Sequence, residues 1–256
     1  MKRINVRNFR NISGYSNKYG ESINENMLFR GGSLDRLSRE DQKYFYDQLH
    51  IKYVLDYRDE IEAGMNPDII ESETVYRRIP ALQFIASAQN GFDFGNMLKG
   101  EMTKDKLQSL LDYLYKGYEQ MAFNNPAYQE LFKIMMRNDG NIYFHCTAGK
   151  DRTGIGAFLI MIALGFHEDE AIKEYLLSNE YLKEENQKLS QIFKIPQEMQ
   201  EECESLLYVQ KEFIQCTIQA IKEKYHDYDE FLKQEYGLDE TRRTQLRRIY
   251  CTANGE

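Results

Sequence analysis

The spacing of apolar and polar positions divides this 256-residue chain into expected strands and helices. Strands are expected at residues 51–57 and 75–80, and the short apolar run at 142–144 has the pattern of a buried strand. Apolar side chains recur at helical spacing over 104–123, and another helix is expected at 126–137. The run GIGAFLIMIALG, residues 154–165, is apolar on all sides, which predicts a helix that is buried all round.

Turn and capping signals locate the elements of the N-terminal part. The first segment is polar and hairpin-like, with Gly14 and Gly20 as turn signals. A helix is expected over 38–49, because Ser38 can cap its first turn and Asp41 follows three residues later. This pair is a weaker variant of the capping box, in which the third residue is usually glutamate or glutamine.

The C-terminal half is expected to be largely helical, with a helix at 168–179 and further helices after Pro196. No repeat or low-complexity linker divides the chain. Strands that alternate with helices predict an α/β fold. We therefore expect one domain over residues 1–256, with a central, mainly parallel sheet flanked by helices.

An irregular segment precedes the helix expected at 104–123. Residues 81–102 carry several glycines, which are loop signals. We expect a helical lid inserted over about 81–123. Its apolar face has two interpretations: contact with the core, or a mobile cover that excludes water from a site. Three aromatic side chains could line the entrance beneath such a cover: Phe84, Phe92 and Phe94.

The sequence HCTAGKDRTG, residues 145–154, joins an expected strand to the apolar helix. A cysteine, five residues and an arginine have the spacing of a loop that wraps around one phosphate. The order strand, tight loop, helix aims unpaired N–H groups and the positive helix end at one point, which favours an anion. The side chains and N–H groups expected to bind the substrate are those of Thr147, Ala148, Gly149, Lys150 and Thr153.

The residue types in this loop suit nucleophilic chemistry on phosphorus. Cys146 should be a thiolate at neutral pH, because a helix N-terminus and a nearby cation lower the pKa of a thiol. A thiolate can attack phosphorus and form a covalent intermediate. Arg152 offers a planar fork of donors that matches two phosphate oxygens. The Thr153 hydroxyl could help the thiolate leave, and His145 is expected to order the loop through backbone contacts.

Cys-x5-Arg alone arises often by chance, but Gly149, Thr153 and the flanking strand and helix signals add specificity. HCTAGKDRTG resembles the signature loop of the cysteine-dependent protein tyrosine phosphatase superfamily. Its Lys150-Asp151 pair is similar to that of the atypical bacterial tyrosine/serine phosphatases, which can also act on phosphoinositides. Further stretches resemble blocks of that family: 8–15, 29–42, 53–62, 174–182 and 238–250. The resemblance implies a tyrosine-phosphatase-like fold and a mechanism without metal or cofactor.

The leaving oxygen needs a proton, and the chain lacks the tryptophan that marks the acid loop of many tyrosine phosphatases. Asp151 is the first candidate acid, because the resemblance implies a catalytic role there; the alternative is a carboxylate that fixes the loop. Asp56 is the second, at the end of a parallel strand, where α/β sites form. Its alternative role is to hold Arg152 or a loop N–H. Arg58 and Glu62 stand four residues apart and are expected to pair with each other.

Charge and composition narrow the choice of partners. The net charge of −8 argues against nucleic acid or an acidic membrane as a general partner. The four cysteines show no metal or redox spacing. The longest apolar run is shorter than the roughly 20 residues that span a bilayer, and MKRINVRNFRN lacks an apolar signal core. We expect a cytoplasmic protein, with export as an effector left open and no oligomeric state indicated.

These observations together predict a phosphomonoester hydrolase that uses a cysteinyl-phosphate intermediate. Its expected main substrate is phosphotyrosine in proteins, with phosphoserine and phosphothreonine as further ones. One alternative is a phosphoinositide or inositol phosphate phosphatase, for which Lys150 would supply a second cation; an equally weighted interpretation is that Lys150 only tunes the field at Cys146. The other alternative, a phosphate-binding module without turnover, is disfavoured because Cys146, Arg152 and Thr153 are all present.

Overall fold

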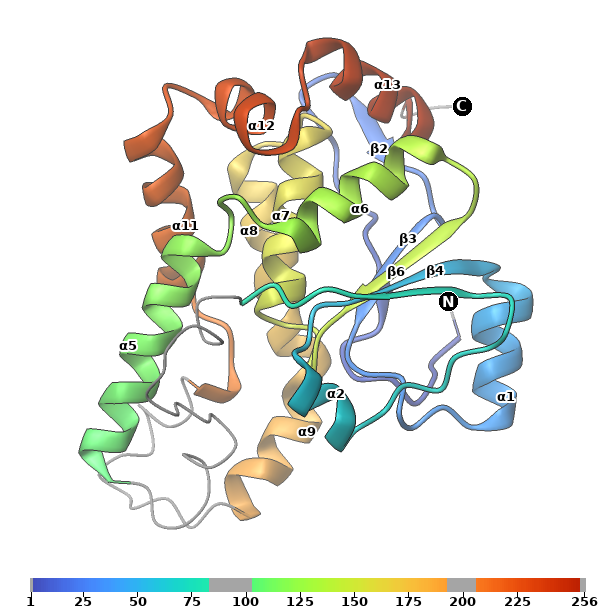
Figure 1. Cartoon of the computed structure of the whole chain (residues 1–256), viewed down its shortest axis with the longest axis vertical. Helices are drawn as coiled ribbons and strands as arrows, with labels where there is room; N and C mark the ends of the chain where they lie inside the picture. The colour runs from blue at the N-terminus through green and yellow to red at the C-terminus, as the bar shows by residue number, and fades with distance from the viewer. Residues whose placement is uncertain (1, 83–102, 193–205, 254–256) are drawn as a thin grey trace.

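A five-stranded sheet forms the centre of the computed structural model, which describes residues 2–82, 103–192 and 206–253 (Figure 1). Its strands lie in the order β1 (Arg10–Asn11), β3 (Leu28–Gly31), β6 (Asn141–His145), β4 (Ile51–Asp56) and β5 (Val75–Arg78). Neighbouring strands are parallel except β1, which is antiparallel to β3. The predicted mainly parallel sheet is confirmed, and its three expected strands are β4, β5 and β6.

Side chains of the sheet enter two hydrophobic cores, because successive residues of a strand face opposite sides. In β6, Tyr143 lies in the smaller core, and Ile142 and Phe144 lie in the larger one. In β3, Phe29 and Leu28 divide in the same way. Because both faces of the sheet are covered, successive residues of these two strands are buried on either side.

The smaller core is closed by α1 (Arg39–Gln42) and the π-helical segment η1 (Lys43–Gln48). The predicted capping box is present. The Ser38 hydroxyl accepts from the N–H of Asp41, and the Asp41 carboxylate accepts from the N–H of Ser38. The predicted helix begins directly after its cap, Ser38, but from Lys43 onward it has π-helical geometry.

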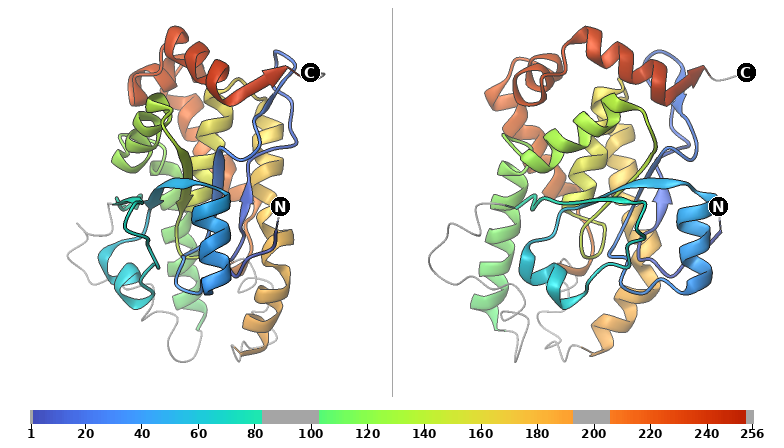
Figure 2. Two further views of the ribbon diagram at one scale, coloured as in Figure 1. Left: turned by 90° about the vertical axis from the view of Figure 1, so that its right-hand side faces the viewer. Right: turned by 45° about the vertical axis from the view of Figure 1, so that its right-hand side comes forward.

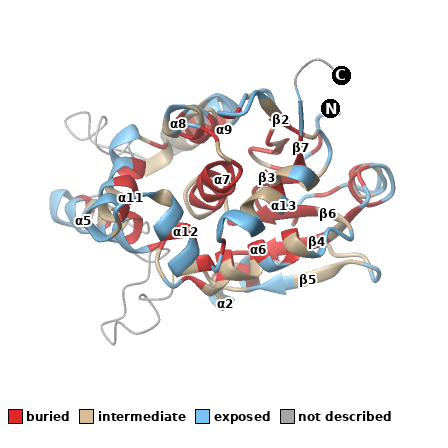
Figure 3. Ribbon diagram, turned by 90° about the horizontal axis from the view of Figure 1, so that it is seen from above, coloured by how far each residue is buried: buried red, intermediate tan, exposed pale blue. Residues whose placement is uncertain are grey.

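The larger core is covered by α6 (Pro126–Arg137), α7 (Arg152–Ala163) and α8 (Glu168–Leu176) (Figure 2). Every residue of α7 after Arg152 is buried, as the apolar run predicted (Figure 3). This helix packs against α8 on one side and the sheet on the other. The helix that follows the cysteine loop is therefore fixed from all sides.

The rest of the C-terminal half is helical, as expected: α9 (Ser178–Ile192), α11 (Lys211–Lys224), α12 (Tyr228–Tyr236) and α13 (Glu240–Tyr250). A two-stranded sheet of β2 (Glu21–Ile23) and β7 (Cys251–Ala253) ties the N-terminal segment to the end of α13. The sequence did not predict this pairing, which joins residues far apart in the chain. Within the described ranges, no helix is both long and apolar enough to cross a membrane.

The helix expected at 104–123 is α5 (Lys104–Gln120), which packs along α11 (Figure 1). Its buried side chains include Leu107, Leu110 and Tyr118. Of this apolar face, Tyr118 and Met121 lie in the larger core, and Leu111 and Leu114 are partly buried against it, so core contact is confirmed for these residues. Residues 83–102, with the three phenylalanines expected at the entrance, lie outside the described residues, so the inserted lid stays a prediction.

Candidate active site

The loop between β6 and α7 lies at the carboxyl edge of the parallel sheet. His145, the last residue of β6, stands in register with Gly31 of β3 and with Asp56 of β4. Gly149 has a φ of 69°, and a Cβ at this position would lie 2.1 Å from the carbonyl carbon of Gly31. Glycine is required here, because both the left-handed backbone and the close approach exclude a side chain.

Cys146 is the first residue of this loop, and it is 2% exposed. Burial raises the pKa of its thiol, but the charge of Arg152 and hydrogen bonds from the hydroxyl and N–H of Thr153 outweigh burial and lower the pKa. The Thr153 hydroxyl is itself buried, and no other partner is found for it among the described residues. The loop therefore stabilises the thiolate, the form in which cysteine is a nucleophile.

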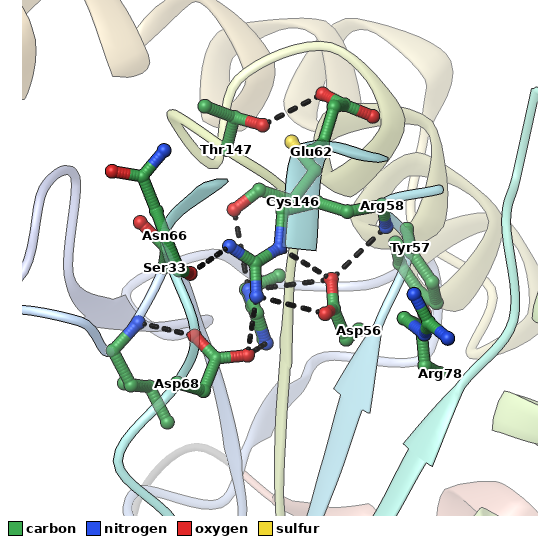
Figure 4. Close-up of polar contacts among 12 residues, drawn as sticks. Ser33, Asp56, Tyr57, Arg58, Glu62, Asn66, Asp68, Arg78, Cys146 and Thr147 are labelled. Atoms are coloured by element: carbon green, nitrogen blue, oxygen red, sulfur yellow. Dashed lines mark hydrogen bonds and ion pairs between the residues drawn. The ribbon is translucent and has the colours of Figure 1, made fainter. Parts of the chain in front are cut away.

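Arg152 is held by a carboxylate that the sequence analysis assigned elsewhere. Its guanidinium donates to Glu62 at 2.5 Å and 2.7 Å, one bond to each carboxylate oxygen. The Thr147 hydroxyl donates to the same carboxylate at 2.8 Å (Figure 4). The expected Arg58–Glu62 pair is wrong, because Arg58 binds Asp56 instead.

A signal for this placement exists in the sequence. Glu62 lies on α2 (Glu60–Met65), where Asp59 and Glu62 form a capping box. Aspartate followed three residues later by glutamate is a helix start signal. The i,i+4 spacing of Arg58 and Glu62 indicated neither this short helix nor the direction of the Glu62 side chain.

Glu62 keeps its charge over the whole working range of pH. Burial raises the pKa of this carboxyl, but Arg152 and Thr147 outweigh burial and lower the pKa from 4.5 to about 2. Because the folded-state pKa is depressed, the stabilisation is fully present above the unfolded pKa, near 4.5, and is lost as the pH falls towards 2. The grip on Arg152 is thus independent of pH near neutrality.

Glu62→Gln is expected to lower kcat/KM for an aryl phosphate by about 10²-fold, because an arginine that is misplaced by about 1 Å loses its fit to the phosphate oxygens. Steady-state kinetics and thermal unfolding would measure this effect. Glu60→Gln, on the exposed face of the same helix, is the matched control and should leave kcat/KM unchanged. Equal kinetics for the two variants would show that Glu62 does not position Arg152.

A second charged cluster lies buried behind the loop (Figure 4). Arg58 lies 2.9 Å from Asp56 Oδ2 and 2.5 Å from Asp68 Oδ2. His145 places Nε2 3.3 Å from Asp68 Oδ2 and Nδ1 3.2 Å from the carbonyl oxygen of Cys146. Burial lowers the pKa of His145, but the two carboxylates outweigh burial and raise it. This geometry supports the expectation that His145 orders the loop through its backbone.

Asp56 is fully enclosed in this cluster. Its carboxylate accepts from the N–H and guanidinium of Arg58 and from the Tyr76 hydroxyl. Both oxygens are used inside the protein, and neither contacts Arg152, so the geometry favours a structural role over the expected second acid. Ligand atoms of Asp56, Asp68 and His145 lie within 4.8 Å of one another, but the Arg58 cation between the carboxylates opposes a metal ion there.

Asp151 is the carboxyl that the loop itself supplies, as the cap of α7. Its side chain is 21% exposed, so an external leaving group can reach it. Lys150 Nζ lies 3.1 Å from Asp151 Oδ2 and donates to the carbonyl oxygen of Leu206 at 3.1 Å. The Tyr118 hydroxyl donates to Asp151 Oδ1 at 2.7 Å. The geometry thus favours Asp151 over Asp56 as the proton donor.

Buried charges also hold the loop from beneath. The carbonyl oxygen of Gly149 accepts from Asn8 at 2.7 Å and from Arg30 at 2.8 Å. Arg30 and Arg10 both pair with Glu174, which is 1% exposed. These residues come from three of the stretches that resemble the phosphatase family: 8–15, 29–42 and 174–182. The sequence alone indicated no role for them. Distant parts of the chain therefore meet to fix one carbonyl of the loop.

The structure brings the predicted substrate-binding residues together, and their roles stay predictions. The Thr147 carbonyl accepts from the N–H of Ser33, which fixes the loop against the segment after β3. Ala148 and Gly149 approach the backbone of Gly31–Gly32 closely. Side chains are excluded from this contact, so the loop presents backbone at the end of the sheet.

Relatives of this chain are found among bacterial phosphatases. A protein of Nostoc commune named tyrosine-protein phosphatase is 28% identical over 167 residues, 63% of this chain and 51% of that protein. The Mycobacterium tuberculosis protein named triple specificity protein phosphatase PtpB is 24% identical over 61% of each chain. This chain thus aligns with about half of the Nostoc relative and less than two thirds of the mycobacterial one.

Wider matches cover nearly the whole chain. A Cupriavidus necator protein, provisionally named a tyrosine-protein phosphatase, is 24% identical over 91% of this chain and 83% of its own length. A solved PP-IP phosphatase domain from S. cerevisiae aligns with 87% of this chain and 96% of that chain, at 12% identity and a TM-score of 0.31, too low for an argument. The model of the tyrosine phosphatase family matches residues 2–252. The chain therefore belongs to the tyrosine phosphatase family.

Proposed function

We propose that this chain is a phosphomonoester hydrolase that works through a cysteinyl-phosphate intermediate, in one domain over residues 1–256. Phosphotyrosine in proteins is the proposed main substrate, with phosphoserine and phosphothreonine as further ones. The main support is Cys146, whose thiol is buried and yet has a lowered pKa, because Arg152 and Thr153 outweigh burial. Cys251, buried away from the loop, shows the opposite: burial raises its pKa to about 12.

The first step transfers the phosphoryl group to the enzyme. The Cys146 thiolate attacks phosphorus, so that an S–P bond forms as the P–O bond to the alcohol breaks. Arg152 and the loop N–H groups stabilise charge on the equatorial oxygens. Asp151, in its protonated form, gives its proton to the leaving oxygen. The products of this step are the free alcohol and the phosphorylated cysteine.

The second step hydrolyses the intermediate. The Asp151 carboxylate takes a proton from water as the water oxygen attacks phosphorus. The P–S bond breaks, and the released thiolate is stabilised by Arg152 and by the Thr153 hydroxyl. Inorganic phosphate leaves, and Asp151 is protonated again. Each group therefore returns to its starting state without a metal or cofactor.

The alternative proposal is a phosphoinositide or inositol phosphate substrate. Support comes from Lys150, a second cation in the loop, and from the triple specificity named for the mycobacterial relative. Against it, the Lys150 ammonium already contacts Asp151 and Leu206. A binding module without turnover is disfavoured, since simple phosphate capture does not need a thiol with a lowered pKa.

We also propose a cytoplasmic location. A thiol with a lowered pKa is prone to oxidation, and a reducing compartment protects it. Phosphorylated proteins are the proposed partners, and nucleic acid is not, given the net charge of −8.

Turnover of a substrate panel tests the proposed function. The panel holds phosphotyrosine peptides, phosphoserine peptides and a series of phosphoinositides, with Cys146→Ser as the blank. The proposal expects the highest kcat/KM for phosphotyrosine peptides. Turnover confined to phosphoinositides would support the alternative instead. No turnover of any phosphomonoester by the full chain would show that the hydrolase proposal is wrong.

Asp151→Asn is expected to lower kcat on phosphoserine peptides by roughly 10²–10⁴-fold, the usual contribution of a general acid. An activated aryl phosphate such as p-nitrophenyl phosphate should lose much less in the first step, because its leaving oxygen needs little protonation. The basic limb of the pH–rate profile should disappear as well, since it reports deprotonation of the acid.

Asp56→Asn is the comparison for this prediction. It leaves Arg58 without a full partner in a buried cluster, so it should lower thermal stability and reduce all substrates by a similar factor. If Asp56→Asn shows leaving-group dependence and Asp151→Asn shows none, then Asp56 is the general acid and Asp151 is the structural carboxylate.

A further inference from the structure

We propose that Tyr118 is a positioning residue for the general acid: its hydroxyl donates to Oδ1 of Asp151 and holds the carboxyl in one orientation. This inference rests on the proposed function and on Asp151 as the acid. It adds a residue of α5, 33 positions away in the sequence, to the machinery of the loop.

The hydrogen bonds at this point form a chain of three side chains. The Tyr118 hydroxyl lies 2.7 Å from Asp151 Oδ1 and 2.7 Å from the Tyr175 hydroxyl. A hydroxyl has one proton to donate and can accept as well. Because Tyr118 gives its proton to Asp151, Tyr175 must donate to Tyr118. The direction of the chain is therefore Tyr175 to Tyr118 to Asp151.

Both tyrosines remain donors under working conditions. Burial, the charge of Asp151 and the neighbouring hydroxyl raise the pKa of Tyr118 well above 10. Burial and Asp151 likewise raise the pKa of Tyr175. Oδ1 of Asp151 therefore keeps this hydrogen bond throughout the working range of pH. Lys150 Nζ lies close to both carboxylate oxygens, 3.3 Å from Oδ1 and 3.1 Å from Oδ2.

The Tyr118 ring is fixed on every side. It is completely buried and stacks on Phe213 of α11 with ring centres 5.4 Å apart. The Thr217 hydroxyl donates to the Tyr118 carbonyl at 2.5 Å. The Tyr175 ring occupies the space next to Gly154, where a Cβ would lie 2.7 Å from it. The hydroxyl thus has a set position relative to the first turn of α7.

This arrangement matters because Asp151 is the most exposed part of the chain of hydrogen bonds. With 21% of its side chain exposed, the carboxyl could otherwise adopt several rotamers. A general acid must lie within hydrogen-bond reach of the leaving oxygen. A rigid donor on one oxygen restricts the carboxyl to one orientation, which pre-organises the proton transfer.

Tyr118→Phe removes only the hydroxyl and keeps the ring. We expect kcat on phosphoserine peptides to fall about 10-fold or more, because a hydrogen bond to a charged group is lost. The burst rate of p-nitrophenol release, which reports the first step, should stay within about 2-fold, since protonation matters little for that leaving group. The basic limb of the pH–rate profile should move to higher pH, because a hydroxyl that donates to the carboxylate is lost.

Two further variants separate positioning from structure. Tyr250→Phe removes another buried hydroxyl, one that donates to the Met135 carbonyl, and should leave the leaving-group dependence and the pH profile unchanged. In an Asp151→Asn background, Tyr118→Phe should add no further leaving-group effect, because the two changes remove one function. If Tyr118→Phe fails to fold, Tyr175→Phe tests the same chain and should shift the basic limb in the same direction.

The outcomes distinguish this inference from the proposed function. In one outcome, the wild-type protein turns over substrate, and Asp151→Asn shows the expected leaving-group dependence. If Tyr118→Phe then keeps the wild-type pH profile, the role of Tyr118 is overturned and the proposed hydrolase function stands. Equal losses in kcat on phosphoserine peptides and in the p-nitrophenol burst rate of Tyr118→Phe would also overturn it, since they indicate general disruption. Absence of any wild-type turnover would instead refute the proposed function itself.

Discussion

Cys146→Ser is expected to abolish turnover, with a loss of about 10⁴-fold or more, as for other enzymes that lose a nucleophile. The serine hydroxyl is not ionised at neutral pH, whereas the thiol has a lowered pKa in this loop. Binding should survive, because Arg152 and the loop N–H groups remain. Single-turnover kinetics would measure the first effect, and calorimetric titration with a phosphotyrosine peptide the second.

Cys251→Ser is the matched control for this prediction. This cysteine is also buried, but burial raises the pKa of its thiol, so that it carries no thiolate. The same substitution there should leave turnover unchanged at temperatures where the protein is folded. Near-normal hydrolysis by Cys146→Ser would remove Cys146 as the nucleophile.

Arg152→Lys is expected to lower kcat/KM by roughly 10²–10³-fold, the usual cost of removing a donor to the developing charge. Lysine keeps the positive charge but loses the planar fork. It would also lose the two-point contact to Glu62, which in this structure sets the plane of the guanidinium. Stopped-flow kinetics on an activated aryl phosphate would report the loss directly.

A second measurement on Arg152→Lys separates charge from geometry. The pH dependence of iodoacetate alkylation reports the pKa of Cys146, which the positive charge at position 152 helps to lower. Lysine should retain most of this effect while turnover is lost. If lysine supports nearly normal turnover, Arg152 acts as a point charge and the assignment of the loop weakens.

Local signals in the sequence predicted the centre of the site well. The geometry of the loop HCTAGKDRTG could be predicted, because the strand before it and the apolar helix after it are adjacent to it in the chain. The Ser38 cap and the apolar periodicity of α5, α6 and α7 are equally local. These elements could be predicted because each depends on residues within about one helix or strand length.

What the sequence did not predict depends on contacts between distant residues. Glu62 meets Arg152 across 90 positions, and the i,i+4 rule assigned it to Arg58 instead. The pairing of β2 with β7 joins the two halves of the chain, and no spacing rule marks it. Tyr118 falls within the apolar periodicity of residues 104–123, which does not indicate that its hydroxyl has a partner on another element. Periodicity identifies which face of a helix is buried, but it does not identify the polar atoms on other elements that this face contacts.

The cysteinyl-phosphate intermediate is tested most directly by rapid quenching during turnover of p-nitrophenyl phosphate. Its good leaving group makes the first step fast, so that the intermediate accumulates and hydrolysis limits the rate. The mechanism predicts a burst of one p-nitrophenol per active site. It also predicts the mass of one phosphate on the peptide that contains Cys146, absent from Cys146→Ser. Steady turnover without a burst, and with no phosphate on Cys146 in the quenched enzyme, would contradict the mechanism.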